Sequence, residues 1–139
     1  MLVEYARNIL GISSADHAET SPGGDTLVVT QLSCSLVGSS DRVRLTPGSR
    51  AAELYGTDAV EEDFFCNYGL NPDYRERLES AGLRVTGVDD DGAVRIVELD
   101  RHPFFLATLF CFQTRSAPGH PHPLVAGLVG AAGRVRPAA

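Results

Sequence analysis

The chain contains no lysine and no tryptophan, and it has only one methionine among 139 residues. All twelve basic residues are therefore arginine, and eighteen acidic residues leave a formal net charge of −6. An acidic chain without an arginine-rich stripe is repelled by phosphate backbones, which argues against a nucleic-acid partner. No apolar run reaches the ~18 residues of a membrane span, and the N-terminus lacks the pattern of a secretory signal. We therefore expect a cytoplasmic protein with neither nucleic acid nor membrane as a partner.

Cysteine is also scarce. The three cysteines, Cys34, Cys66 and Cys111, are widely separated and form no C-x-x-C pair. This argues against a disulfide framework and against a structural zinc site. We predict a reduced chain with no resident metal and no cofactor, in which the simplest interpretation of the cysteines is three small, half-buried thiols.

Hydrophobic residues make up 43% of the chain and charged residues 22%, which is the composition of an ordinary globular protein. This length corresponds to one domain. We predict that residues 1–132 form that domain and that residues 133–139 form a flexible tail.

Helices are predicted from apolar residues at helical spacing and from capping residues. Gly11 and Gly56 each follow such a segment and are suited to end it, whereas Asn71 and Pro72 are suited to begin one. The predicted helices cover residues 4–10, 50–54, 73–81 and 124–132.

Strands are predicted where β-branched and apolar residues gather: residues 26–36, 43–45, 64–70, 83–88, 93–99 and 104–112. The D-D-D-G sequence at 89–92 predicts a hairpin turn. We interpret its aspartates as solvated, because a calcium loop spreads its ligands over twelve residues. The apolar run at 104–112 is typical of a strand buried on both faces of a mostly parallel sheet.

His120 and His122 form an H-x-H pair, a spacing that can chelate a metal on a strand. Prolines on both sides of His122 disturb that geometry, so we predict a structural turn before the last helix.

Several blocks, taken in order, resemble the C-terminal glutamine amidotransferase domain of CTP synthase, a class I amidotransferase. They are E-Y-A-R-N-I-L-G at 4–11, T-P-G-S at 46–49, Y-G at 55–56, N-P at 71–72, I-V-E-L at 96–99, H-P-F-F at 102–105 and P-H-P-L at 121–124. The resemblance extends from residue 4 to about residue 132, and the part from 96 to 124 aligns without a gap. It implies a class I glutamine amidotransferase-like, flavodoxin-like three-layer α/β fold.

The resemblance also implies a chemistry. That family hydrolyses glutamine with a cysteine nucleophile on a strand-to-helix elbow, a histidine base and a glutamate that orients the histidine, and it passes the ammonia to a domain that aminates UTP. In the family, the elbow and three strands precede the helix that begins here at Met1. The resemblance therefore implies a sheet truncated on its N-terminal side. We expect a second copy of the chain, another chain or a preceding segment to cover it.

The histidine and glutamate of the family lie in a Q-F-H-P-E-F run, which aligns with L-F-C-F-Q-T at 109–114. Cys111 stands in the place of the histidine and Gln113 in the place of the glutamate. A thiol is no near-neutral base with two nitrogens, and an amide does not stabilise an imidazolium. Cysteine at the position of the base resembles the stand-alone relatives of this domain.

The segment that recognises the substrate's carboxylate in the family is rich in arginine and histidine, and it aligns with residues 63–67 and Tyr68. Here that segment contains no cation. The resemblance makes Cys66, Asn67 and Tyr68 the candidate substrate-binding residues, for glutamine or another small molecule. A further hypothesis is that Cys66 and Cys111 face one cleft, as a thiol pair or a soft metal site.

The sequence therefore predicts a diverged glutamine amidotransferase-like domain, related to the enzyme of CTP biosynthesis, without glutaminase activity in this chain. The alternative is an active enzyme, thiol-dependent or of the CTP synthase type, whose nucleophile elbow lies upstream of Met1. A plain interaction domain that keeps only the fold is a third interpretation.

Overall fold

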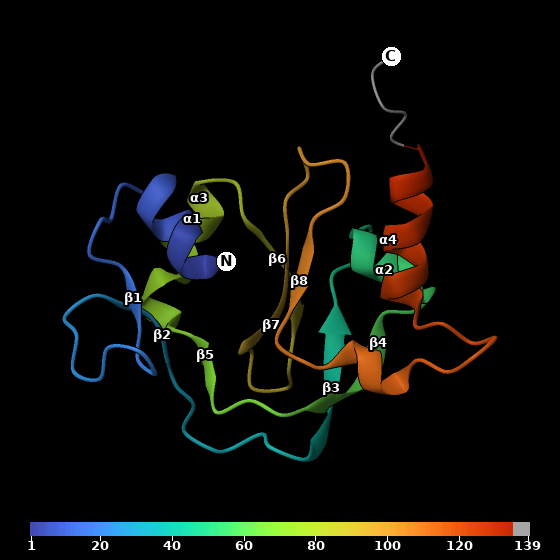
Figure 1. Cartoon of the computed structure of the whole chain (residues 1–139), viewed down its shortest axis with the longest axis horizontal. Helices are drawn as coiled ribbons and strands as arrows, with labels where there is room; N and C mark the ends of the chain where they lie inside the picture. Colours follow the sequence, from blue (N-terminus) through green and yellow to red (C-terminus); the bar gives the residue numbers. More distant parts are fainter. Residues whose placement is uncertain (135–139) are drawn as a thin grey trace.

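The computed structural model describes residues 1–134, and it confirms the α/β class with two β-sheets and flanking helices (Figure 1). The larger sheet has the strand order β4-β3-β6-β7-β8, and every neighbouring pair in it is antiparallel. Its strands are β3 (Ser39–Leu45), β4 (Ala59–Phe64), β6 (Arg84–Val88), β7 (Val94–Glu98) and β8 (Leu106–Thr108).

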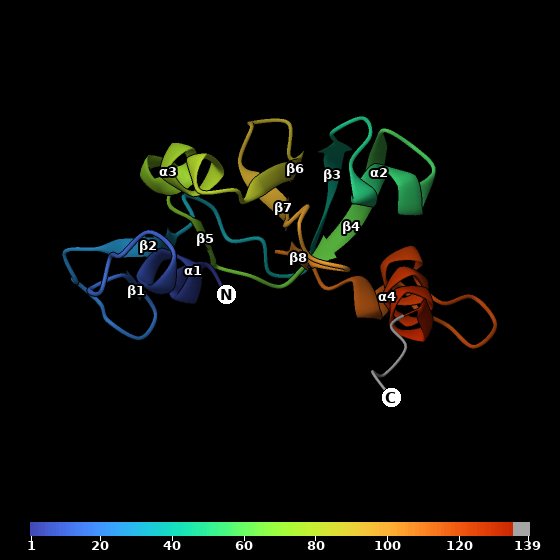
Figure 2. The same cartoon turned by 90° about the horizontal axis from the view of Figure 1, so that it is seen from above.

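The smaller sheet has the order β1-β2-β5, in which β1 and β2 are parallel and β2 and β5 are antiparallel. Its strands are β1 (Asp16–His17), β2 (Leu27–Gln31) and β5 (Tyr68–Leu70). The helices α1 (Leu2–Asn8) and α3 (Arg75–Ser80) lie on this side of the molecule, with the short 3-10 turn η1 (Pro72–Tyr74) leading into α3 (Figure 2).

The other helices, α2 (Arg50–Tyr55) and α4 (Pro123–Arg134), lie on the opposite side, beyond the larger sheet (Figures 1 and 2). A second 3-10 turn, η2 (Phe112–Arg115), precedes α4. None of the helices in the described part of the chain has both the length and the apolar character needed to cross a bilayer.

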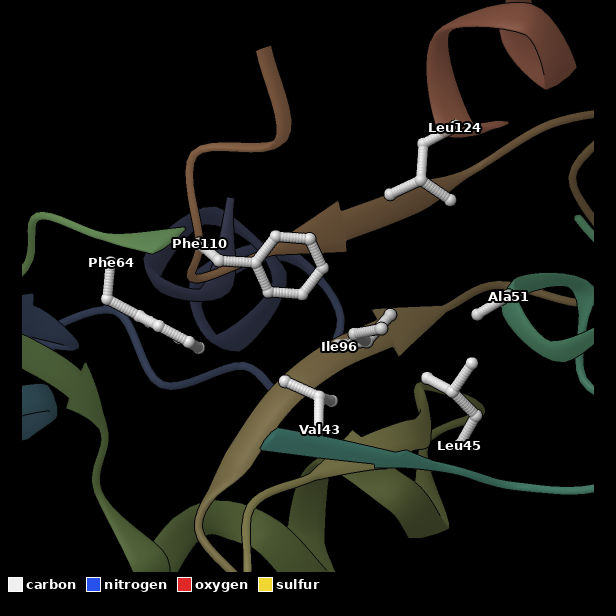
Figure 3. Close-up of a cluster of buried hydrophobic side chains, with 7 residues drawn as sticks. All are labelled: Val43, Leu45, Ala51, Phe64, Ile96, Phe110 and Leu124. Carbon is white, nitrogen blue, oxygen red and sulfur yellow. The ribbon is translucent and has the colours of Figure 1, made fainter. Parts of the chain in front are cut away.

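Strand β7 separates two hydrophobic cores, because successive side chains of a strand point to opposite faces. Ile96 packs with residues of β3, α2 and α4, while Val97 packs with residues of α1, β2 and α3. The buried side chains of the first core converge in Figure 3, where the rings of Phe64 and Phe110 meet edge to face with their centroids 5.8 Å apart.

Most of the local signals for caps and turns are confirmed, but α1 ends at Asn8 with Ile9 as its C-cap, so the prediction that Gly11 ends this helix is wrong. Gly56 ends α2 with a positive φ of 71°, and the Asn71 side chain caps η1 by accepting a hydrogen bond from Asp73 N. The hairpin between β6 and β7 turns at Gly92, which has a φ of 84°. The short loop therefore uses glycine where the backbone must be left-handed.

The strand predicted at 104–112 is wrong in length and in setting. β8 has three half-buried residues and pairs antiparallel with β7, not within a mostly parallel sheet. Phe110 leaves the sheet and inserts into the first core, and η2 begins two residues later. An apolar run does not distinguish a strand from a loop whose side chains pack into a core.

Other boundaries also differ. The strand predicted at 64–70 is two strands, since β4 ends at Phe64 and β5 begins at Tyr68. The strand predicted at 26–36 ends at Gln31, and the last helix extends to Arg134, beyond the start of the predicted tail. The rest of that tail, 135–139, lies outside the described residues.

Gly87 of β6 permits a close contact between two strands. A Cβ atom on Gly87 would lie 2.6 Å from Ile96 Cγ1 and 2.9 Å from Ile96 Cβ, and Ile96 is fully buried. We expect Gly87→Ala to lower the free energy of unfolding by about 1–3 kcal/mol, measured by urea denaturation. The control is Gly130→Ala on α4, where the added Cβ meets nothing closer than 3.9 Å and helix propensity favours alanine by up to about 1 kcal/mol. Equal effects of the two substitutions would contradict this account of Gly87.

Candidate functional site

A cavity of about 450 Å³ lies between the start of α1, the β5 region and the strands β7 and β8. We call it the β7–β8 pocket. Met1, Leu2 and Val3 of the α1 segment line it, so the N-terminus of the chain lies beside it, between the two sheets (Figures 1 and 2). Its volume is that of a site for a small molecule.

The three residues predicted to bind substrate all line the β7–β8 pocket. Cys66 and Asn67 lie in the short connection from β4 to β5, and Tyr68 begins β5. The structure therefore brings together the residues that the sequence grouped.

Cys66 is held as a neutral thiol. Its Sγ donates a hydrogen bond to the Leu109 carbonyl oxygen at 3.1 Å. Burial raises the pKa of the Cys66 thiol, and the neighbouring Cys111 raises it further. A raised pKa lowers the thiolate fraction, and the thiolate is the nucleophilic form. Cys66 is therefore poorly suited to nucleophilic attack at neutral pH.

Cys111 and Gln113 lie outside the lining of the pocket. Cys111 is half-buried at the start of η2, and its backbone N–H donates to the Asp63 carbonyl oxygen at 2.9 Å. Gln113 is exposed on η2. Cys111 does not line this pocket, but it lies near enough to Cys66 to raise the pKa of that thiol. The hypothesis that Cys66 and Cys111 face one cleft as a thiol pair stays a prediction.

In three histidines, one ring nitrogen, Nδ1, already forms a hydrogen bond with the backbone. Nδ1 of His17, His102 and His122 accepts a hydrogen bond from the backbone N–H of Glu19, Phe104 and Leu124, respectively. In the neutral ring this leaves the proton on Nε2. His17 lines the pocket, and its ring lies 5.0 Å from that of Tyr68.

Arg95 on β7 also lines the pocket, and it is a residue that the sequence analysis missed. Its side chain is only 7% exposed and pairs with Asp89 of the hairpin turn, at 2.5 Å from Nη2 to Oδ2. Asp89 is half-buried, which corrects the expectation that all three turn aspartates are solvated. The sequence signal that could have identified Arg95 is an arginine within the apolar strand V-R-I-V, since arginine is rarely buried without a partner.

No protein-family model matches the chain. The similar sequences and the similar solved structure described next are all CTP synthases. The chain is 37% identical over 141 residues to the CTP synthase of Koribacter versatilis, an alignment that covers 93% of this chain. It is 38% identical over 148 residues to the CTP synthase of a Nocardioides species, covering 95%. Its structure matches that of the Trypanosoma brucei CTPS glutaminase domain, solved with bound acivicin, with a TM-score of 0.89 and 27% identity over 99% of this chain.

This chain is related to the C-terminal glutaminase domain of CTP synthase. The resemblance and the class I amidotransferase fold predicted from the sequence are thereby confirmed. The chain spans about a quarter of the length of these CTP synthases, and 57% of the solved glutaminase chain. The match therefore concerns part of one domain of the larger enzyme.

In this relative of CTP synthase, His122 belongs to a buried polar cluster on the side of the first core. Its Nε2 donates to Glu62 Oε1 at 2.8 Å, and the Tyr55 hydroxyl donates to the same oxygen at 2.6 Å. Burial, followed by the bond to Glu62, raises the pKa of Tyr55 far above its ordinary value, so Tyr55 remains a donor. Nothing in the short-range sequence pattern signals this contact across 60 residues.

Arg115 of η2 lies at the outer side of this cluster. It donates to Asp63 Oδ1 at 2.6 Å, and this bond holds the pKa of the Asp63 carboxyl below its ordinary value. The Asp63 side chain is thus bonded to Arg115, and it does not line the β7–β8 pocket. In residues 1–134, no group of three or more histidine, cysteine, aspartate or glutamate side chains is placed to hold a metal ion.

Proposed function

We propose that this chain is a diverged glutamine amidotransferase-like domain that binds glutamine or another small molecule and lacks glutaminase activity of its own. The observation that carries the proposal is the run at 109–114. By the resemblance to the family, Cys111 and exposed Gln113 stand where the family has its histidine and glutamate, and neither residue lines the β7–β8 pocket.

The chemistry of the pocket supports the same proposal. Hydrolysis needs a thiolate, a base that deprotonates the thiol and later protonates the leaving ammonia, and a group that orients the base. Cys66 has a raised pKa, and Nδ1 of His17 already accepts a hydrogen bond from the Glu19 N–H. The pocket can therefore hold a ligand, but its described residues supply no activated nucleophile.

We expect no ammonia release from L-glutamine by the purified chain above the rate in buffer, because loss of a whole triad removes about 10⁶-fold in kcat in a comparable hydrolase. A coupled glutamate dehydrogenase assay measures it, with an active glutaminase as the positive control. Ammonia release that is lost in Cys66→Ser would contradict the proposal and would identify Cys66 as the nucleophile. Release that survives this substitution would contradict it as well.

The second candidate is an active enzyme in which a segment upstream of Met1 supplies the nucleophile elbow. The lining of the pocket by Met1, Leu2 and Val3 favours this candidate, since a residue preceding α1 would reach the cavity. An in-frame G-x-C-x-G sequence immediately upstream in the genomic DNA separates it from the first proposal.

We also propose a partner chain or a second copy of this chain at the outer edge of β8. Within the described residues, β8 pairs on one side only, with β7. Met1 and Phe65, both at the pocket, are about half exposed. Unpaired strand edges and exposed apolar side chains are features that proteins commonly cover. A cytoplasmic location remains part of this proposal.

A further inference from the structure

The fold brings two of the three cysteines close together, although they are far apart in the sequence. Cys66 lies in the connection from β4 to β5, and Cys111 lies just before η2. The Cys66 Sγ donates to the Leu109 carbonyl oxygen at 3.1 Å, and the Cys111 N–H donates to the Asp63 carbonyl oxygen at 2.9 Å. Each cysteine therefore bonds to the segment that carries the other.

Electrostatics and exposure agree with this arrangement. Cys111 raises the pKa of the Cys66 thiol, because two neighbouring thiolates repel each other. Both residues are half-buried, whereas Cys34 is exposed in the connection from β2 to β3. Neighbouring thiols that remain partly open to solvent are the starting point for disulfide formation.

We propose that Cys66 and Cys111 are a redox-sensitive pair that a peroxide converts to a disulfide, and that this bond fixes one wall of the β7–β8 pocket to the start of η2. Cys66 lines the pocket and Cys111 does not, so the bond joins the pocket wall to a segment outside it. To form it, the Cys66 side chain releases the Leu109 carbonyl oxygen and turns toward Cys111. The proposal concerns the redox state of the pocket wall and holds with or without glutaminase activity.

The reaction balances with hydrogen peroxide as the oxidant. Peroxide oxidises one thiolate to a sulfenic acid, and the first water leaves. The sulfur of the second cysteine attacks the sulfenic sulfur, the S–O bond breaks, and a second water leaves as the S–S bond forms. The two thiols thus lose two electrons and two protons, which the peroxide takes up.

The two cysteines have different roles in this sequence. The raised pKa of Cys66 lowers its thiolate fraction, so Cys111 is the thiol that peroxide oxidises first. Cys66 then attacks the sulfenic acid of Cys111, because holding the two groups side by side offsets the low thiolate fraction.

Tryptic mapping of the oxidised protein tests the pair. Every cation of the chain is arginine, so trypsin places Cys34, Cys66 and Cys111 in three separate peptides, 8–42, 51–75 and 102–115. The purified, reduced chain is treated with hydrogen peroxide, and its remaining thiols are blocked with N-ethylmaleimide before digestion. We expect peptide 51–75 to be joined to peptide 102–115, with a mass lower by two hydrogens than their sum, until dithiothreitol separates them. The yield should not depend on protein concentration, because the bond lies within one chain.

Three serine variants assign the roles. Cys34→Ser is the matched control and should give the same linked peptides as the wild type. Cys66→Ser keeps a donor for the Leu109 carbonyl oxygen, but it should lose the linked peptides and leave a sulfenic acid on Cys111 that dimedone labels. Cys111→Ser should also lose the linked peptides, and dimedone should label its Cys66 more slowly.

Hydrogen exchange tests the effect on the pocket wall. The Leu36 N–H donates to the Cys66 carbonyl oxygen at 3.1 Å. Since a crosslink restricts local opening of this segment, we expect the Leu36 amide to exchange roughly tenfold more slowly in the oxidised protein. Reduction with dithiothreitol should restore the original rate.

Oxidation that joins Cys34 to another cysteine, or that leaves both Cys66 and Cys111 blocked by N-ethylmaleimide, would overturn the proposal. A linked pair that leaves the exchange rate of Leu36 unchanged would overturn it too, because the pocket wall would not be fixed. Ammonia release from L-glutamine would contradict the proposed function, and the linked peptides would still decide the pairing of the two cysteines.

Discussion

Glu62→Ala is expected to lower the free energy of unfolding by about 2–6 kcal/mol, because it leaves two buried donors without their acceptor, at about 1–3 kcal/mol each. Glu62 is 2% exposed and His122 is 4% exposed. Without the carboxylate, the Nε2–H of His122 and the hydroxyl of Tyr55 both lose their acceptor, which is a single oxygen, Glu62 Oε1. Since small domains are stable by about 5–15 kcal/mol, this substitution removes a large fraction of the total.

The neighbouring residue on the same strand provides a matched control. The side chain of Glu61 is 70% exposed, and Arg115 approaches it no closer than 3.9 Å. Glu61→Ala should therefore change stability by no more than about 0.5 kcal/mol. Chemical denaturation monitored by circular dichroism compares the two variants. A loss in Glu62→Ala no larger than in Glu61→Ala would show that the buried cluster does not stabilise the fold.

Glu62→Gln separates the contribution of charge from that of shape. The amide keeps one oxygen that can accept from His122 and Tyr55, but it replaces a charge-assisted pair with neutral hydrogen bonds, which are about half as strong. We expect its stability to fall between that of the wild type and that of Glu62→Ala.

The features that the sequence predicted are those set by neighbouring residues. A glycine is needed where the φ of Gly56 and Gly92 is positive, and Asn71 caps the turn that follows it. These effects act over a few residues, so they are readable without knowledge of the fold. The resemblance to sequence blocks of CTP synthase also predicted the overall fold, which local signals do not give.

The features that the sequence missed depend on contacts between distant segments. Strand β4 begins A-V-E-E-D, a poor strand sequence by propensity. It pairs with β3 along its whole length, from Ala59 opposite Arg44 to Phe64 opposite Ser39, and its Phe64 side chain is fully buried in the first core. The partner strand and its register are not visible in the local sequence.

At the candidate site, too, the sequence indicated groups of neighbouring residues but not contacts between distant ones. Cys66, Asn67 and Tyr68 are adjacent in the sequence, and all three line the β7–β8 pocket, while their role in binding a substrate stays a prediction. Arg95 lines the same pocket from strand β7, whereas Cys111 does not line it. A sequence alignment does not show which residues of different strands line one pocket.

Glu98→Ala is the second substitution with a large expected effect. Glu98 is 2% exposed, and its carboxylate accepts from the first backbone N–H groups of α2, at 3.1 Å from Arg50 N and 2.9 Å from Ala51 N. It also accepts from Thr86 Oγ1 at 2.9 Å. A carboxylate at a helix N-terminus interacts favourably with the unpaired N–H groups and with the helix dipole. Each hydrogen bond to a charged group contributes about 1.5–3 kcal/mol, so we expect a loss of about 3 kcal/mol or more.

Hydrogen exchange identifies the origin of this loss. In Glu98→Ala the amide of Ala51 should exchange faster than the rest of α2, because it has lost its acceptor, whereas general destabilisation would speed all core amides equally. Asp100→Ala is the control, since Asp100 pairs with Arg84 at the surface and such pairs contribute about 0–1 kcal/mol. An unchanged Ala51 exchange rate would contradict the capping role. Faster exchange would mean that the glutamate of the I-V-E-L block holds the first turn of α2 in place.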